Sequence, residues 1–297
     1  MLFIDVVLPV FIIIFTGFVL EKRTDLDLKA LTYSSLYLFS PCLVFSALVK
    51  QPVDLTLAAD LGLFMLLYTG AMLLLSFACG RLLRFDRESR SALSLTTVMM
   101  NVGNFGLPLA FFAYGEAGLD VSIMTFVLFN IPLGSLAIVI AQGSGAPLKE
   151  ALLNTAKIPI FHGVILAFII KSVDLVIPPF LLRPIELLGQ AAIPVMLVIL
   201  GMQLARTKLG RHGRFFTLSA LLRLVAAPAL ALLLATLLGF EGLTHNVVVL
   251  QTSTPSAVLP LLYAMRFGSR PDLVAGAIFV STLFSAVSLT LLLYILH

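Results

Sequence analysis

The stretch NVGNFGLP, which begins at Asn101, places two amides, two glycines and a proline inside a long apolar run. Asn101 and Asn104 are three positions apart and share a face if helical, and their amides suit the recognition of a carboxylate. Gly103 and Gly106 allow the helix to unwind, and Pro108 suits the first turn of a new half-helix. The free N–H groups of such a helix end attract anions without a buried lysine.

A second polar stretch, QTSTPSAVLP, interrupts another apolar run and begins at Gln251. Its candidate binding residues are Gln251, Ser253, Thr254, Pro255 and Ser256. Pro255 and Pro260 are both candidates for the break in this helix: the polar cluster favours Pro255, and the repeat described below favours Pro260. We expect the two interrupted helices to meet near the bilayer midplane around one small polar site.

Three further polar residues lie inside apolar runs. Asn130 adds to the same site or forms an interhelical hydrogen bond. Ser40, before Pro41, lines the cavity or bonds its own helix backbone. Arg223 attracts an anion or extends its charge to the membrane surface, and we favour the second interpretation.

The composition requires a membrane. Of the 297 residues, 60% are hydrophobic and 11% are charged, against about 25% charged residues in soluble domains. The net charge of +4 does not indicate nucleic acid, because the basic residues lie in short loops. The sequence contains no GxSxG or HExxH motif and no metal-ligand spacing. We therefore expect a membrane protein that is not an enzyme and binds neither cofactor nor metal.

Apolar runs of about 20 residues predict transmembrane helices. The ten predicted spans are 2–20, 29–49, 57–80, 91–114, 121–142, 151–171, 180–204, 215–238, 243–265 and 272–296. Connections after odd-numbered spans, with the adjoining span ends, carry 15 Lys and Arg, and the others carry 3. By the positive-inside rule, the chain lies in the inner (plasma) membrane with both termini outside.

The chain also shows an internal repeat. The pairs Pro9 and Pro159, Pro41 and Pro194, and Pro108 and Pro260 are separated by 150, 153 and 152 residues. The repeat predicts two halves, 1–147 and 148–297, with five spans each. An odd number of spans gives the halves opposite orientations, as in many secondary transporters. The predicted helix breaks or hinges are Pro41, Pro108, Pro194, Pro255 and Pro260.

The strings NVGNFGLPLA and AIPVMLVILGMQL and the ten spans resemble the auxin efflux carrier family, in its compact bacterial form, over essentially the whole chain. The resemblance implies an all-α membrane protein with a five-plus-five inverted repeat and two broken crossover helices, similar to bile-acid symporters and sodium–proton antiporters. It implies carriage of small organic anions, such as mono- or dicarboxylates or auxin-like acids, and a homodimer with elevator-type movement. Spans 1, 2, 6 and 7 would form the scaffold, and spans 3–5 and 8–10 the transport domain. The family's polar positions map onto Asn104 or Asn101 and onto Ser253 or Ser256.

The acidic residues bear on the driving force. No Asp or Glu lies at the centre of a predicted span, which disfavours a sodium–proton antiporter because that exchange needs a buried carboxylate. H⁺, Na⁺ and the membrane potential all stay open as driving forces. The alternative function is a sodium-coupled symporter for a larger organic anion, similar to the bile-acid carriers.

Overall fold

A computed structural model describes residues 2–24, 26–50, 54–142, 153 and 155–297. The boundary predicted between the halves at 147–148 and the first residues of the predicted span 151–171 lie outside the described residues. The helices, in chain order and with η marking π-helical turns, are η1 (Phe3–Val7), α1 (Leu8–Arg23), α2 (Leu28–Ser34), η2 (Ser35–Phe39), α3 (Ser40–Lys50), α4 (Leu55–Leu82), α5 (Arg87–Val98), η3 (Val102–Gly106), α6 (Leu107–Gln142), α8 (Pro159–Ser172), α9 (Pro179–Arg206), α10 (Gly213–Leu221), η4 (Leu222–Ala226), α11 (Ala227–Leu237), α12 (Gly242–Thr252), α13 (Leu259–Phe267) and α14 (Pro271–Leu296).

Helices α5, α12 and α13 are each too short to cross a bilayer. At a rise of about 1.5 Å per residue, the 12, 11 and 9 residues of α5, α12 and α13 extend about 18, 17 and 14 Å. The hydrocarbon core is about 30 Å thick. The apolar segments predicted at 91–114 and 243–265 are therefore each divided, because helix ends at Val98 and resumes at Val102, and ends at Thr252 and resumes at Leu259.

The segment from η3 through α6 is, by contrast, longer than one bilayer crossing requires. Its 41 residues would extend about 60 Å if straight, roughly twice the bilayer core. Gly115 divides it: the residue adopts φ 65° and ψ −155°, a conformation available essentially only to glycine. The predicted spans 91–114 and 121–142 thus share α6.

The chain is a helical membrane protein. Seven helical segments of the described chain are long and apolar enough to cross a membrane. This number is smaller than ten because α5, α12 and α13 are half-length, α8 has 14 residues, and two predicted spans share α6.

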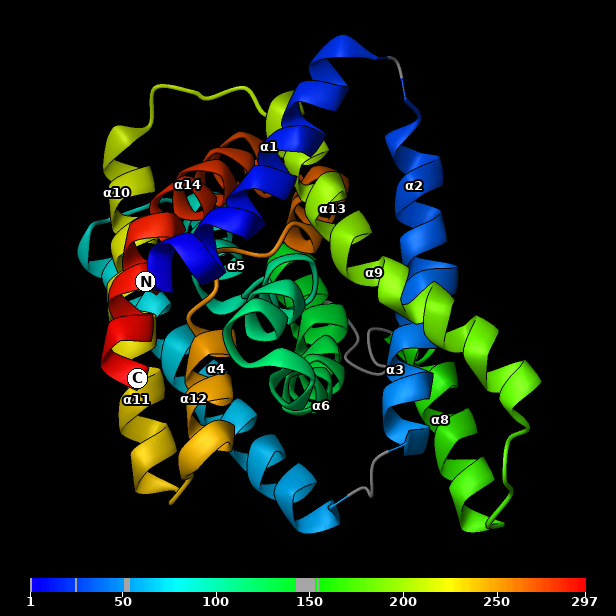
Figure 1. Ribbon diagram of the computed structural model, residues 1–297. Helices are drawn as coiled ribbons and strands as arrows, with labels where there is room; N and C mark the ends of the chain where they lie inside the picture. Colours follow the sequence, from blue (N-terminus) through cyan, green and yellow to red (C-terminus); the bar gives the residue numbers. More distant parts are fainter. Residues whose placement is uncertain (1, 25, 51–53, 143–152, 154) are drawn as a thin grey trace.

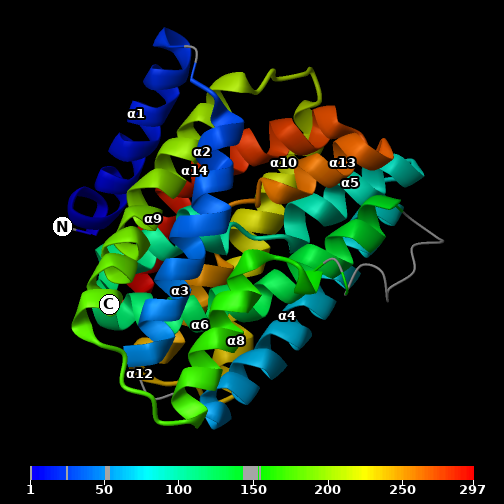
Figure 2. The same cartoon turned by 90° about the vertical axis from the view of Figure 1, so that its right-hand side faces the viewer.

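The helices form two packed groups. In the first, α1 packs along α9, and α3 packs against α8 and α9 (Figure 2). In the second, α4, α5, α6 and α10 to α14 pack on one another (Figure 1). The groups contact each other mainly where η3 meets α9 and where η1 meets α6. In addition, Phe11 of α1 makes an edge-to-face contact with Phe105 of η3.

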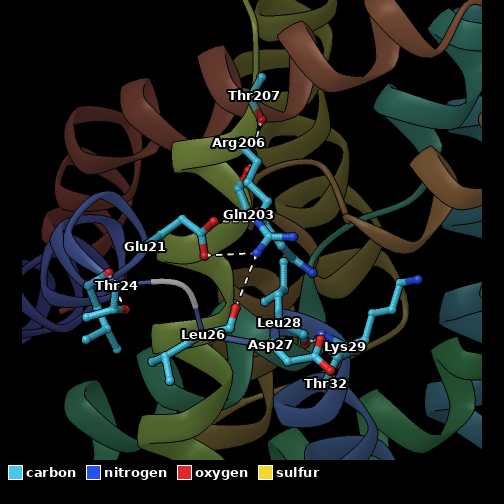
Figure 3. A network of polar contacts seen from close by, with 11 residues as sticks. Glu21, Thr24, Leu26, Asp27, Leu28, Lys29, Thr32, Gln203, Arg206 and Thr207 are labelled. Carbon is cyan, nitrogen blue, oxygen red and sulfur yellow. Dashed lines mark hydrogen bonds and ion pairs between the residues drawn. The ribbon is translucent and has the colours of Figure 1, made fainter.

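The α1–α9 pair is joined closely by small residues and by an ion pair. Alanine at Gly17 or Gly201 would place its Cβ inside the backbone of the opposite helix, so the two helices approach as closely as glycine permits. At one end of the pair, the Arg206 guanidinium donates to the Glu21 carboxylate at 2.6 Å and to the Leu26 carbonyl at 3.5 Å (Figure 3). The second of these contacts also holds Leu26, which lies shortly before α2, against the end of α9.

Candidate functional site

The two helix interruptions lie directly against each other. Met100 and Ser256 form an isolated antiparallel β-bridge. The Asn101 N–H donates to the Pro255 carbonyl at 2.8 Å, and the Ala257 N–H donates to the Met99 carbonyl at 2.8 Å. Backbone groups that a continuous helix would satisfy internally are thus satisfied between the two segments, which permits non-helical backbone within an apolar core.

The prolines take different places relative to the interruptions. Pro255 lies inside the second interruption, and Pro260 is the second residue of α13, directly after the interruption. In the first segment the interruption precedes the glycines and Pro108. The helix resumes with the π-helical turn η3, and Pro108 follows as the second residue of α6.

Hydrogen-bond donors are available where η3 begins. The first N–H groups of a helix have no carbonyl of their own helix to bond. Beside them, the Asn101 side chain is 5% exposed, and its Nδ2 has no hydrogen-bond partner in the described part of the chain. Asn104 is partly exposed in the same turn. A buried amide donor without a partner costs about 1–3 kcal/mol, so a ligand that accepts a hydrogen bond would bind favourably here.

The hydroxyl groups of the second stretch are used differently. Ser253 donates to Val249 at 2.6 Å, and Thr254 donates to Gln251 at 2.7 Å, both to carbonyls of α12. Ser256 donates to the Thr96 carbonyl of α5 at 2.5 Å. A hydroxyl has one proton to donate, so these three side chains close helix ends and have no donor left for an anion.

The Gln251 side chain of α12 packs against η3 and α6, which belong to the first interrupted segment. It is fully buried, its Nε2 donates to Ser122 of α6, and its Oε1 has no partner in the described part of the chain. A Cβ built on Gly106 would overlap the Gln251 carboxamide, so α12 lies against the end of η3. A Cβ on Gly103 would lie 2.7 Å from the Phe126 ring. Both glycines of NVGNFGLP lie within the helical turn η3 without a positive φ, so they serve close packing and do not unwind the helix as the sequence interpretation expected.

We expect Gly106→Ala to lower the melting temperature by roughly 4 °C or more, because the added methyl group displaces the buried Gln251 carboxamide. Gln251→Ala removes the obstructing group, so the Gly106→Ala/Gln251→Ala variant should melt higher than the sum of the two single effects predicts. Thermal unfolding of the four purified proteins measures the coupling. Purely additive effects would contradict the contact.

Arg223 belongs to the site. The favoured sequence interpretation, in which its charge extends to the membrane surface, is wrong. The side chain is 0% exposed and does not reach a membrane surface. Its guanidinium donates to the Thr97 carbonyl at 2.8 Å, to the Tyr68 hydroxyl at 2.8 Å and to the Thr252 carbonyl. A charged residue inside an apolar span was the signal that could have revealed this role.

The other sequence candidates bond their own helices. The Asn130 amide donates to Phe126 at 2.7 Å, and the Ser40 hydroxyl donates to Ser35 at 2.7 Å. Helix α9 continues through Pro194 without a break. Pro41 lies in the first turn of α3, directly after the π-helical turn η2, and the helix is continuous there as well.

The interruptions are enclosed by protein. Gln251, Ser253, Thr254 and Ser256 are 0% exposed. Two cavities of about 590 and 300 Å³ lie elsewhere, the first beside Lys171 and Asp174 and the second beside Arg211, Arg214 and Arg270. No cluster of three His, Cys, Asp or Glu side chains suited to a metal occurs among the described residues. The second interruption is closed in this conformation, whereas Asn104 beside the first is partly exposed.

These features define a multi-pass helical membrane protein in which two interrupted helices meet inside the apolar core. The chain belongs to the family described as membrane transport protein, whose model matches residues 2–151 and 147–293. The sequence resemblance to the auxin efflux carrier family is thereby confirmed, and membership points to a secondary transporter and not to an enzyme.

Named relatives agree with this class. An uncharacterized transporter of Methanocaldococcus jannaschii is 27% identical over 97% of this chain and 96% of its own length. A Rhizobium meliloti protein named "Putative malonate transporter" is 28% identical over 98% of this chain and 95% of its own length. Auxin efflux carrier component 1 of Arabidopsis thaliana is 25% identical over 50% of this chain and 24% of its own length.

Proposed function

We propose that the chain is a secondary carrier for small organic acid anions, bound where the two helix interruptions meet. The observation that carries the proposal is the pair of backbone hydrogen bonds that holds the interruptions together. The donors offered to a carboxylate are the N–H groups at the start of η3, the Leu259 N–H at the start of α13, and the amides of Asn101 and Asn104. The Rhizobium relative named for malonate supports a small carboxylate as the substrate class.

Electrostatics supports an anion of low charge. Each helix N-terminus carries about +0.5 of an elementary charge, so two such ends provide about +1. The acidic residues nearest to the interruptions in sequence are Glu88 and Glu241, which lie in the first turn of α5 and at the N-cap of α12. Each of these residues lies at the N-terminal end of its half-helix, and the interruption follows the C-terminal end. A carboxylate substrate therefore meets no competing carboxylate from these helices.

The packing supports movement of one helix group against the other. Helices α1, α3, α8 and α9 would form the scaffold, and α4 to α6 with α10 to α14 would move as an elevator that carries the interruptions across the membrane. The enclosed site fits a carrier, since alternating access requires such movement. We further propose ten spans in two inverted halves, a homodimer formed through the scaffold, and a location in the inner membrane with both termini outside.

Binding of a carboxylate should raise the melting temperature of the purified protein. A ligand at 100 times its Kd stabilises the folded state by about 2.7 kcal/mol, or roughly 5–10 °C for a chain of this size. We expect at least one member of a panel of mono- and dicarboxylates, malonate included, to produce such a shift. Asn104→Ala should reduce it by half or more, because the variant loses a donor at the start of η3.

Asn246→Ala is the matched control. This amide lies in the middle of α12, away from the interruption, and donates to Leu296 at 3.0 Å, so its loss should leave the carboxylate shift intact. Amines of similar size should produce no shift. If an amine stabilises the protein and no carboxylate does, the proposed substrate class is wrong. Counterflow of the stabilising compound in proteoliposomes then separates a carrier from a channel.

A further inference from the structure

Arg223 joins the two half-helices that lead into the interruptions. Thr97 and Thr252 belong to the last turns of α5 and α12. The carbonyl groups of these turns have no N–H of their own helix to bond, since each helix stops there. One guanidinium, held in the π-helical turn η4, donates to both carbonyls and to the Tyr68 hydroxyl, which itself donates to Thr252 at 2.7 Å.

The charges at this junction balance without a carboxylate. Each helix C-terminus carries about −0.5 of an elementary charge, so the ends of α5 and α12 together provide about −1. The guanidinium provides +1 and stays protonated at any physiological pH. Its recorded hydrogen-bond partners are two carbonyls and one hydroxyl. Because the guanidinium neutralises the two helix C-termini, the partial positive charge of the two helix N-termini remains available to attract an anionic substrate.

Carbonyl groups at the C-terminal ends of broken helices are ligands that Na⁺ uses in coupled transporters. In this chain those carbonyls are already bonded to a fixed cation. We propose that Arg223 is a built-in counter-charge that takes the place of a coupling cation, so that the protein binds and carries its anion without Na⁺. The part of the inference that concerns transport rests on the proposed function, whereas the counter-charge part does not.

The first experiment uses the wild-type protein. Its melting temperature and its malonate counterflow in proteoliposomes are measured in NaCl and in N-methylglucamine chloride at equal ionic strength. We expect the melting temperature to agree within about 1 °C and the flux within about twofold. A flux that falls about tenfold or more without Na⁺, or a marked stabilisation by Na⁺ over N-methylglucamine, would overturn the proposal.

The second experiment removes the charge. Arg223→Ala should lower the melting temperature by roughly 6 °C or more, because two buried carbonyls lose a charged donor. Millimolar methylguanidinium chloride should restore part of this loss and should not stabilise the wild type, and N-methylglucamine chloride should restore less. A variant as stable as the wild type, or one that no small cation stabilises, would refute the role of Arg223.

A more conservative pair covers the case in which the alanine variant does not fold. Arg223→Lys keeps the charge, and Arg223→Met keeps the size of the stem without it. A higher melting temperature for the lysine variant supports the counter-charge, and equal values overturn it. Failure of the proposed function would look different, because no carboxylate would then stabilise the wild type while these comparisons kept their expected order.

Discussion

Asn101→Leu should abolish most transport and leave the protein as stable as before. The amide is buried and its Nδ2 has no partner in the described part of the chain, so an apolar side chain of similar shape removes an unsatisfied donor. Such a replacement is neutral or stabilising for folding. A carboxylate substrate, by contrast, would lose a hydrogen bond to a charged group, which is about 1.5–3 kcal/mol or about tenfold or more in flux.

The same substitution at Asn246 serves as the control, because this amide has the opposite properties. It donates to Leu296 at 3.0 Å and lies in the middle of α12, not at the interruption. Asn246→Leu should therefore lower the melting temperature by roughly 2–4 °C and keep the flux within about twofold. Thermal unfolding and counterflow on both variants give the comparison. If Asn101→Leu unfolds more easily and transports normally, the amide is a packing residue and not a ligand.

Gly201→Ala should destabilise the protein strongly. The added Cβ would overlap the Ile14 carbonyl and approach the Phe18 N–H, and both obstacles are backbone atoms of α1 that cannot rotate away. Helices α1 and α9 would have to separate along their whole contact. Overpacking of this kind costs about 3 kcal/mol or more, which lowers the melting temperature by roughly 6–12 °C. Thermal unfolding in detergent measures the change.

Gly70→Ala provides the matched control in another membrane helix. A Cβ at Gly70 in α4 meets no atom within 4 Å, so the same substitution adds a methyl group to open space. The melting temperature should stay constant or rise by about 1–2 °C, because alanine favours helix more than glycine does. Equal losses for both variants would show that the effect comes from the substitution itself and not from the α1–α9 contact.

The sequence alone determined the class of protein and the positions of the unusual segments. Apolar runs long enough for a bilayer identified a membrane protein, because hydrocarbon accepts only segments whose backbone is satisfied internally. Polar and proline residues within two of these runs predicted that each run is interrupted, although α5 ends at Val98, before the glycines and Pro108 that were expected to form the break. These signals are local: a helix breaks where its own residues remove donors or favour turns. The family resemblance, confirmed by the family model, rested on the same segments.

Only the tertiary structure decided which polar groups are free. The sequence shows that Ser253, Thr254 and Ser256 carry hydroxyls, but their protons are used on carbonyls of α12 and α5. It shows an arginine in an apolar run, but the two carbonyls that bind Arg223 lie 126 and 29 residues away along the chain. Whether a buried group has a partner depends on distances between segments remote in sequence, which no local pattern contains. Asn101, a candidate from the sequence, differs from those hydroxyls for that reason, because folding buries its amide and leaves a donor unused.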